Sequence, residues 1–117
     1  MRSILVVDDE VELGKLYQHE LEEEGFNVLI AKDGYEAIHL ARANDIDLMV
    51  LDIKMEGMDG LEVLNEFRMK NADTPVILNS AYSTYKDDFS TWLADAYVVK
   101  SGNLDELKSR IRELLRV

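Results

Sequence analysis

The chain has 117 residues, no cysteine and a net charge of −11 at pH 7, which favours one domain with its own core and excludes disulfides and thiolate metal sites. The acidic excess argues against a nucleic-acid binder, which needs a basic face, and no apolar run reaches the roughly 18 residues of a membrane-spanning helix. Three acids follow the first apolar run and interrupt any signal-peptide pattern, so we expect a cytoplasmic domain without membrane insertion.

Five short apolar runs recur along the chain and predict β-strands. They cover residues 3–7, 26–31, 47–51, 75–80 and 96–100, and each is rich in valine, isoleucine or leucine. Several of these runs do not alternate with polar residues, a pattern typical of strands that are covered on both faces. We therefore expect a sheet that lies between two layers of helices.

The segments between these strands carry apolar residues at helical spacing. The first stripe ends near Gly25, a residue type that suits the end of a helix. In chain order, the stripes consist of Leu13, Leu16, Tyr17 and Leu21; Tyr35, Ile38 and Ala41; Leu61, Leu64 and Phe67; and Leu104, Leu107, Ile111, Leu114 and Leu115. Residues 83–93 have the least regular pattern, so the fourth helix is expected to be short or irregular.

Four of the expected helices start with the same signal, a capping residue followed three positions later by a glutamate. The pairs are Asp9–Glu12, Asp33–Glu36, Asp59–Glu62 and Asn103–Glu106. This signal also offers a purely structural interpretation of Asp9, as a helix cap. Because strand and helix alternate five times, the chain favours an α/β domain over residues 1–117, with a parallel sheet and right-handed crossovers.

Polar side chains follow several of the predicted strands, at the edge of the sheet where ligands of this fold class bind. Asp8 and Asp9 follow the first strand, Asp52 follows the third, and Ser80 and Lys100 end the fourth and fifth. If the first and third strands are neighbours, three carboxylates converge there and repel one another. A divalent cation would remove that repulsion, and oxygen ligands favour Mg²⁺ or Ca²⁺. A lysine and a hydroxyl nearby suit a phosphoryl group, and Asp52 is a candidate nucleophile.

Together these segments resemble the response-regulator receiver domain, the phosphoacceptor half of two-component signalling. The matching stretches are "ILVVDDE" (4–10), "LMVLDIKMEGMDGLEVL" (48–64), "PVILNSAY" (75–82) and "DAYVVK" (95–100), in this order. The resemblance covers nearly the whole chain. It implies a doubly wound, flavodoxin-like five-stranded parallel sheet of order 2-1-3-4-5, with helices on both faces.

The resemblance also implies an acceptor and a metal site. Asp52 would accept the phosphoryl group from a phosphohistidine of the kinase. Asp9 and Asp52 would ligate Mg²⁺ directly, Asp8 would act through a water molecule, and the backbone carbonyl of Lys54 would complete the protein ligands.

Four further residues receive roles from the same resemblance. Lys100 and the Ser80 hydroxyl would contact phosphoryl oxygens, and Ala81 is small where a backbone N–H must approach the phosphoryl group. Tyr97 matches the aromatic switch position, which moves inward when Ser80 engages the phosphoryl group. Such a switch is a two-state element that a local change of charge biases.

Lys54 and Tyr82 occupy the positions that flank the phosphoryl group in receivers and control the access of water. Both are large here, as in the sporulation phosphorelay receiver, so we expect slow loss of the phosphoryl group by hydrolysis. The expected partners are a sensor histidine kinase or a histidine phosphotransfer protein, together with an unknown output protein. The domain would be a monomer or weak dimer and a signalling component without a turnover substrate.

The sequence departs from the family pattern at several positions. Ser101 follows the site lysine where the family usually has proline, Glu56 replaces another common proline, and the stretch from Ser80 to Lys100 is short. These departures leave open an interaction module with the same fold that is not phosphorylated. A second alternative is a Mg²⁺-dependent phosphohydrolase with an aspartyl nucleophile, although such enzymes place a second aspartate where this chain has Lys54.

Overall fold

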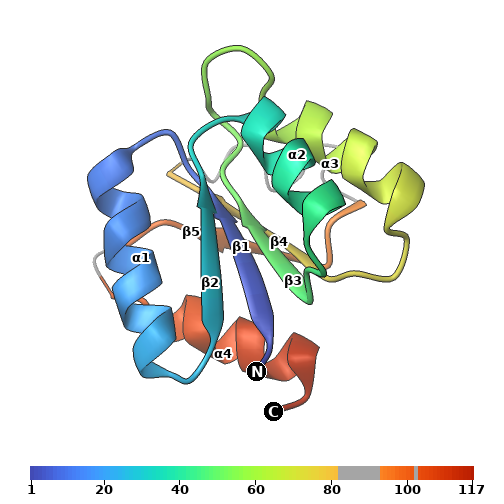
Figure 1. The fold of residues 1–117 in the computed structure, drawn as a ribbon. Coiled ribbons are helices and arrows are strands. Elements are labelled where there is room, and N and C mark those ends of the chain that lie inside the picture. Colours follow the sequence, from blue (N-terminus) through green and yellow to red (C-terminus); the bar gives the residue numbers. More distant parts are fainter. Residues whose placement is uncertain (82–92, 102) are drawn as a thin grey trace.

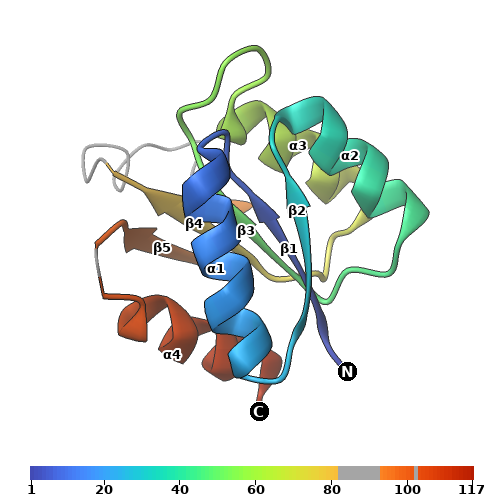
Figure 2. The ribbon, with the colours of Figure 1, turned by 60° about the vertical axis from the view of Figure 1, so that its left-hand side comes forward.

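A parallel five-stranded sheet of order β2-β1-β3-β4-β5 forms the centre of the folded molecule (Figures 1 and 2). The structure is a computed structural model that describes residues 1–81, 93–101 and 103–117. The strands are β1 (Ser3–Val7), β2 (Asn27–Ala31), β3 (Leu48–Leu51), β4 (Val76–Ser80) and β5 (Ala96–Val99). The helices of the described residues are α1 (Val11–Glu23), α2 (Gly34–Ala43), α3 (Gly60–Lys70) and α4 (Asp105–Leu115). The predicted fold class and strand order are confirmed.

Two apolar clusters fill the space on the two faces of the sheet. Alternate residues of β1 point to opposite sides, so Ile4 and Val6 join one cluster while Leu5 and Val7 join the other. Helices α1 and α4 cover the first face, and α2 and α3 cover the second (Figures 1 and 2). Because both faces are covered, the central strands contain apolar residues at nearly every position, as predicted.

Two of the four predicted helix caps are confirmed. The Asp33 side chain accepts a hydrogen bond from the Glu36 backbone N–H at the start of α2, and Asp59 and Glu62 form a reciprocal capping box at the start of α3. Satisfied N–H groups at these helix ends support the predicted start points. At the other end of α1, Gly25 has a φ of +96°, which explains why a glycine ends that helix.

The predicted cap at Asp9 is wrong, and the N-cap of α4 lies one residue after the predicted Asn103. Helix α1 has Glu10 at its N-cap and α4 has Leu104, and neither cap residue makes a side-chain capping hydrogen bond. The Asp9 carboxylate instead lies beside those of two other aspartates. The Asn103 side chain accepts a hydrogen bond from the N–H of Asp105, the first residue of α4, so it still satisfies a backbone group at the start of that helix.

The helix predicted fifth from the sequence is the one labelled α4 in the figures. The short fourth helix expected over 83–93 lies outside the described residues, apart from Leu93 at its end. No peptide bond between described residues is cis, so Lys100 and Ser101 are joined by a trans bond. None of the described helices is long and apolar enough to cross a membrane.

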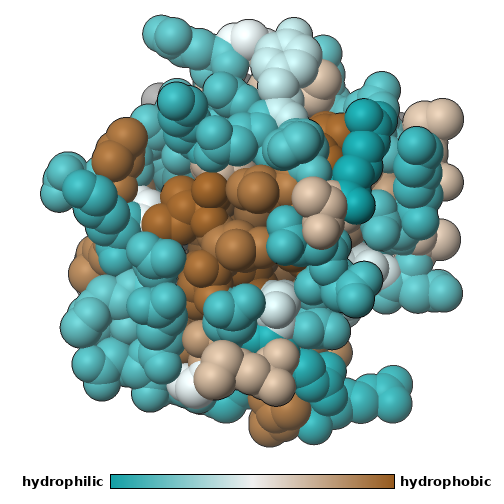
Figure 3. Space-filling model, viewed as in Figure 1, coloured by the Kyte–Doolittle hydropathy of each residue, from teal (hydrophilic) through white to brown (hydrophobic). Residues whose placement is uncertain are grey.

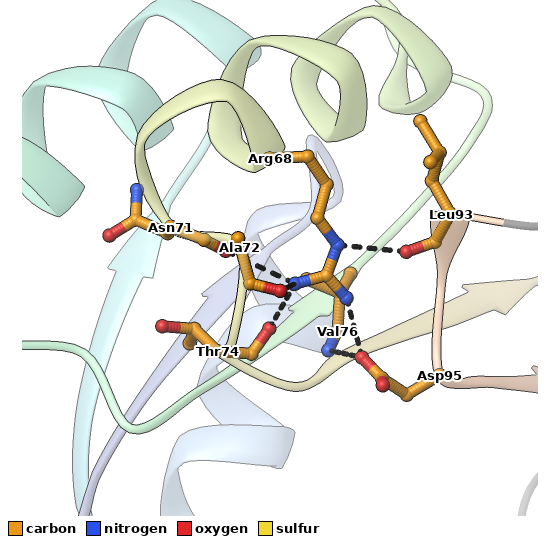
Figure 4. A network of polar contacts seen from close by, with 7 residues as sticks. All are labelled: Arg68, Asn71, Ala72, Thr74, Val76, Leu93 and Asp95. Atoms are coloured by element: carbon orange, nitrogen blue, oxygen red, sulfur yellow. Dashed lines mark hydrogen bonds and ion pairs between the residues drawn. The ribbon is translucent and has the colours of Figure 1, made fainter.

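The guanidinium of Arg68 on α3 links chain segments at the amino-terminal ends of strands β4 and β5 (Figure 4). It donates to the Asp95 carboxylate and to the backbone carbonyls of Asn71, Ala72, Thr74 and Leu93. Asp95 also accepts a hydrogen bond from the Val76 N–H at the start of β4. The network therefore joins the end of α3 to the segments that lead into β4 and β5.

Strand β2 forms one edge of the sheet and brings apolar atoms to the surface there. Figure 3 shows an apolar area in the middle of the face on which β2 lies in Figure 1. Leu29 and Ile30 of β2 are half-buried, whereas Val28 and Ala31 are buried. This edge is exposed because the polypeptide provides no sixth strand among the described residues to pair with it.

Candidate functional site

Four of the predicted site residues lie at the carboxyl ends of four different strands. Asp8 follows β1, Asp52 follows β3, Ser80 ends β4 and Lys100 follows β5. Main-chain hydrogen bonds continue the sheet to these positions: Asp8 N–H to Ala31 O, Asp52 N–H to Val7 O, and Lys100 N–H to Ser80 O. The parallel sheet therefore brings residues that are far apart in the chain to one edge of the molecule.

Three carboxylates meet at this edge. One carboxylate oxygen from each of Asp8, Asp9 and Asp52 lies within 4.8 Å of the others. Asp8 and Asp52 are buried, whereas Asp9 is exposed. Neighbouring carboxylates without a counter-charge are unfavourable, so the cluster needs a cation of some kind.

Lys100 supplies a positive charge to two of these carboxylates. Its Nζ lies 2.9 Å from Asp8 Oδ2 and 3.1 Å from Asp52 Oδ2, and its side chain is only 11% exposed. Glu10 Oε1 lies further off, at 4.0 Å from the same nitrogen. The ammonium group thus bridges the ends of β1 and β3 from its own position after β5.

Burial changes the protonation chemistry of the cluster. It raises the pKa of Asp52 to about 6; the Lys100 charge and hydrogen bond oppose this rise, while Asp8 and Asp9 add to it. Burial alone would lower the pKa of Lys100, but its hydrogen bonds and charge interactions with Asp8 and Asp52 outweigh that effect and raise it. At neutral pH the arrangement therefore keeps Lys100 charged beside an ionised Asp52.

The start of α3 packs directly against the backbone of Asp52. The Gly60 N–H donates to the Ile53 carbonyl over 2.8 Å. A Cβ atom at Gly60 would lie 2.1 Å from the Asp52 carbonyl oxygen, so only glycine fits there. Residue 60 therefore sets how closely α3 approaches the strand end that carries Asp52.

The remaining predicted site residues that the structure describes differ in burial. Ser80 is fully buried, Ala81 after it is exposed, and Lys54 is exposed two residues after Asp52. Tyr97 on β5 is half-buried and packs against the cluster under α2 and α3. Tyr82 lies outside the described residues.

Glu10 was predicted to lie in the acidic run after the first strand but received no role of its own, and Gly60, Tyr17 and Asn79 were not predicted to lie near the site. Glu10 stands next to the two aspartates and its charge was the available signal. Gly60 follows a helix cap, but its close approach to Asp52 is visible only in three dimensions. Asn79 precedes Ser80 in an otherwise apolar run and hydrogen-bonds to Tyr17, which had been assigned to an apolar stripe.

Comparison with protein families gives one match over most of the chain. Residues 4–112 match the family described as response regulator receiver domain. The probable transcriptional regulatory protein TcrX of Mycobacterium tuberculosis is 39% identical over 116 residues, which make up 97% of this chain and 50% of that protein. The chain thus spans about half the length of this curated relative.

Comparison with solved structures gives close matches in both fold and sequence. The response regulator protein TrrA from Thermotoga maritima, in complex with Mg²⁺-BeF, is 48% identical with a TM-score of 0.95, and the match covers 97% of this chain and 99% of that one. A structure of the histidine kinase ThkA in complex with TrrA also matches, with 49% identity, a TM-score of 0.93, and 98% and 99% of the two chains covered.

Proposed function

Because this chain belongs to the response regulator receiver domain family, we propose that Asp52 accepts a phosphoryl group from a phosphohistidine and that the domain then signals by a change of conformation. The observation that carries the proposal is the placement of Lys100 Nζ, 3.1 Å from Asp52 Oδ2 and 2.9 Å from Asp8 Oδ2. A buried ammonium beside an acceptor carboxylate is suited to the negative charge of a phosphoryl group. The domain would act as a signalling component without a turnover substrate.

The three carboxylates fit a Mg²⁺ ion. They provide only oxygen donors, two of them buried and one exposed, and their oxygens lie within 4.8 Å of one another. Asp9 and Asp52 would bind the ion directly, Asp8 through water, and the Lys54 backbone carbonyl would add a further ligand. When bound, the ion supplies positive charge that neutralises phosphoryl oxygens, and the Mg²⁺-BeF complex of TrrA supports this assignment.

The transfer step needs little chemistry from the protein besides positioning and charge. An Asp52 carboxylate oxygen forms the new bond to phosphorus while the phosphorus–nitrogen bond of the phosphohistidine breaks. The imidazole leaves with the electron pair of that bond. Lys100 donates a hydrogen bond to one phosphoryl oxygen and the Ser80 hydroxyl donates to another, while the small Ala81 leaves room for its backbone N–H.

The response to phosphorylation would pass through Ser80 and Tyr97. Both lie on neighbouring strands, because β4 pairs with β5. A Ser80 that turns toward the phosphoryl group leaves space that the half-buried Tyr97 ring can take. Lys54 and Tyr82 would restrict the approach of water and lengthen the lifetime of the phosphorylated state.

The partners follow from the same assignment. The complex of ThkA with TrrA supports a sensor histidine kinase as the phosphoryl donor, and a histidine phosphotransfer protein offers the same chemical group. The curated relative TcrX is described as a transcriptional regulatory protein and is about twice as long as this chain. For residues 1–117 we propose a receiver role that acts on an output protein.

Incubation with acetyl phosphate and Mg²⁺, followed by intact-mass measurement, tests the proposal. The wild type should gain the mass of one phosphoryl group, and Asp52→Ala should gain none. Asp73→Ala, which removes an exposed carboxylate away from the site, should behave like the wild type. A wild type without an adduct would exclude the phosphoacceptor role and favour an interaction module, and steady release of phosphate from small phosphoesters would favour a phosphohydrolase.

A further inference from the structure

Asn79 is a buried polar side chain to which the proposed function gives no role. The buried polar or charged side chains of the described residues are Asp8, Asp52, Asn79 and Ser80. The other three belong to the site, and Asn79 directly precedes Ser80 on β4. A buried amide is unfavourable unless it is hydrogen-bonded, so its partner indicates why an amide is present there.

The partner of Asn79 is Tyr17 on α1. Asn79 Nδ2 donates to the Tyr17 hydroxyl oxygen over 2.9 Å, between residues 62 positions apart in the chain. Tyr17 is 1% exposed and belongs to the apolar cluster beneath α1 and α4. Helix α1 packs on β1 and β2, whereas β4 lies two strands beyond β1. The hydrogen bond therefore ties the helix to a distant part of the sheet.

Both ends of this hydrogen bond belong to segments that form the site. Helix α1 begins at Val11, directly after the segment that holds Asp8 and Asp9, and Asn79 is adjacent to Ser80. Burial raises the pKa of Tyr17, and the charges of Lys100, Asp8 and Asp52 also influence this pKa. The bond thus joins the segment of the carboxylates to the segment of the hydroxyl.

We propose that Tyr17 and Asn79 are positioning residues, whose hydrogen bond fixes the end of β4 against α1 and so directs the Ser80 hydroxyl toward a phosphoryl group on Asp52. The inference rests on the proposed function. Residue 79 is one peptide unit from Ser80, so an anchor at its side chain restricts the backbone that carries the hydroxyl. A displacement of about 1 Å in such a group costs up to about 100-fold in rate.

A pair of substitutions separates this role from a purely structural one. Tyr17→Phe removes only the hydroxyl and leaves the buried Asn79 amide without its hydrogen-bond partner. The unpaired amide should lower the free energy of unfolding. The double variant Tyr17→Phe/Asn79→Leu replaces both partners with apolar groups of similar shape, so its urea midpoint should return close to that of the wild type. Its phosphorylation by acetyl phosphate with Mg²⁺ should nevertheless remain roughly tenfold slower. A double variant with wild-type rate would overturn the proposal.

The same double substitution in a Ser80→Ala background tests whether the effect passes through Ser80. No further loss of rate is expected there, because the hydroxyl that the bond positions is absent. An equal loss in both backgrounds would also overturn the proposal. Ile111→Val, a destabilising change in the same apolar cluster, should keep the wild-type rate and controls for stability itself.

These measurements also distinguish the failure of this inference from a failure of the proposed function. If the wild type gains no phosphoryl adduct, or gains one that Asp52→Ala also gains, the phosphoacceptor role is excluded. The positioning role of Tyr17 and Asn79 is then excluded as well. If the wild type is phosphorylated and the double variant is equally fast, only the positioning role is excluded.

Discussion

Substitution of Gly60 by alanine tests how tightly α3 is packed against the strand end that carries Asp52. A Cβ atom at residue 60 would lie 2.1 Å from the Asp52 carbonyl oxygen and 2.7 Å from Ile53 Cα, whereas real Cβ atoms essentially never approach within 3.0 Å. The helix start and the strand end must therefore separate by about 0.9 Å. Both are backbone segments, so no flexible side chain can move aside to make the space.

The size of the effect follows from this displacement. Overpacking of this kind costs about 1–3 kcal/mol, and a weakened hydrogen bond from the Gly60 N–H to Ile53 adds about 1 kcal/mol. The better helix propensity of alanine offsets up to about 1 kcal/mol. We expect a net loss of about 2 kcal/mol in urea unfolding. Because Asp52 moves with its backbone, phosphorylation by acetyl phosphate should slow by up to about 100-fold.

Gly14→Ala is the matched control. A Cβ atom at Gly14, inside α1, would meet Ile30 Cγ2 at 3.4 Å, which is ordinary van der Waals contact. Alanine in a helix interior should leave stability unchanged or raise it by up to about 1 kcal/mol, with no change in the phosphorylation rate. The reasoning is refuted if Gly60→Ala retains wild-type stability and rate, or if Gly14→Ala loses as much as Gly60→Ala.

Two further predictions concern the buried charges. Burial raises the pKa of Asp52 to about 6, above its value of about 4 in an unfolded chain, so between these values the folded protein holds a proton that the unfolded chain has released. We therefore compare the free energy of unfolding of the metal-free wild type with that of Asp52→Asn. The difference, wild type minus variant, should fall as pH rises from about 4 to about 6 and stay level above pH 6. A difference that does not vary with pH contradicts the raised pKa. Arg68→Lys keeps the charge but cannot satisfy the carbonyls of the Arg68 network, so urea unfolding should show a loss of about 2 kcal/mol. Arg110→Lys, in an exposed pair with Glu113, should change stability by less than about 0.5 kcal/mol, and equal losses at the two positions would speak against the network.

The sheet and the helices could be predicted because burial leaves a direct mark on local sequence. The run from Ile4 to Val7 is apolar at every position since both faces of β1 are covered. The order of the strands left no such mark, because spacing along the chain does not indicate which strands are neighbours. The order 2-1-3-4-5 was predicted only through the resemblance to receivers.

The grouping of Asp8, Asp52 and Lys100 could also be anticipated, since the carboxyl ends of parallel strands share one edge. What local sequence could not indicate is competition between partners in three dimensions. Asp9 has the spacing of a helix cap, yet its carboxylate lies with those of Asp8 and Asp52. The contact of Asn79 with Tyr17 was equally hidden, because each residue was interpreted within its own apolar segment.

Among the described residues, the sheet divides the interior into two compartments that share no side chains, because each strand residue points to only one of them. A substitution under α1 and α4 therefore needs compensation only from its own compartment, and the same holds under α2 and α3. Over evolutionary time each outer surface can adapt to new neighbours independently of the other. The edge where Asp8, Asp52 and Lys100 meet borders both compartments. A change in packing on one side can therefore affect the other side through these residues.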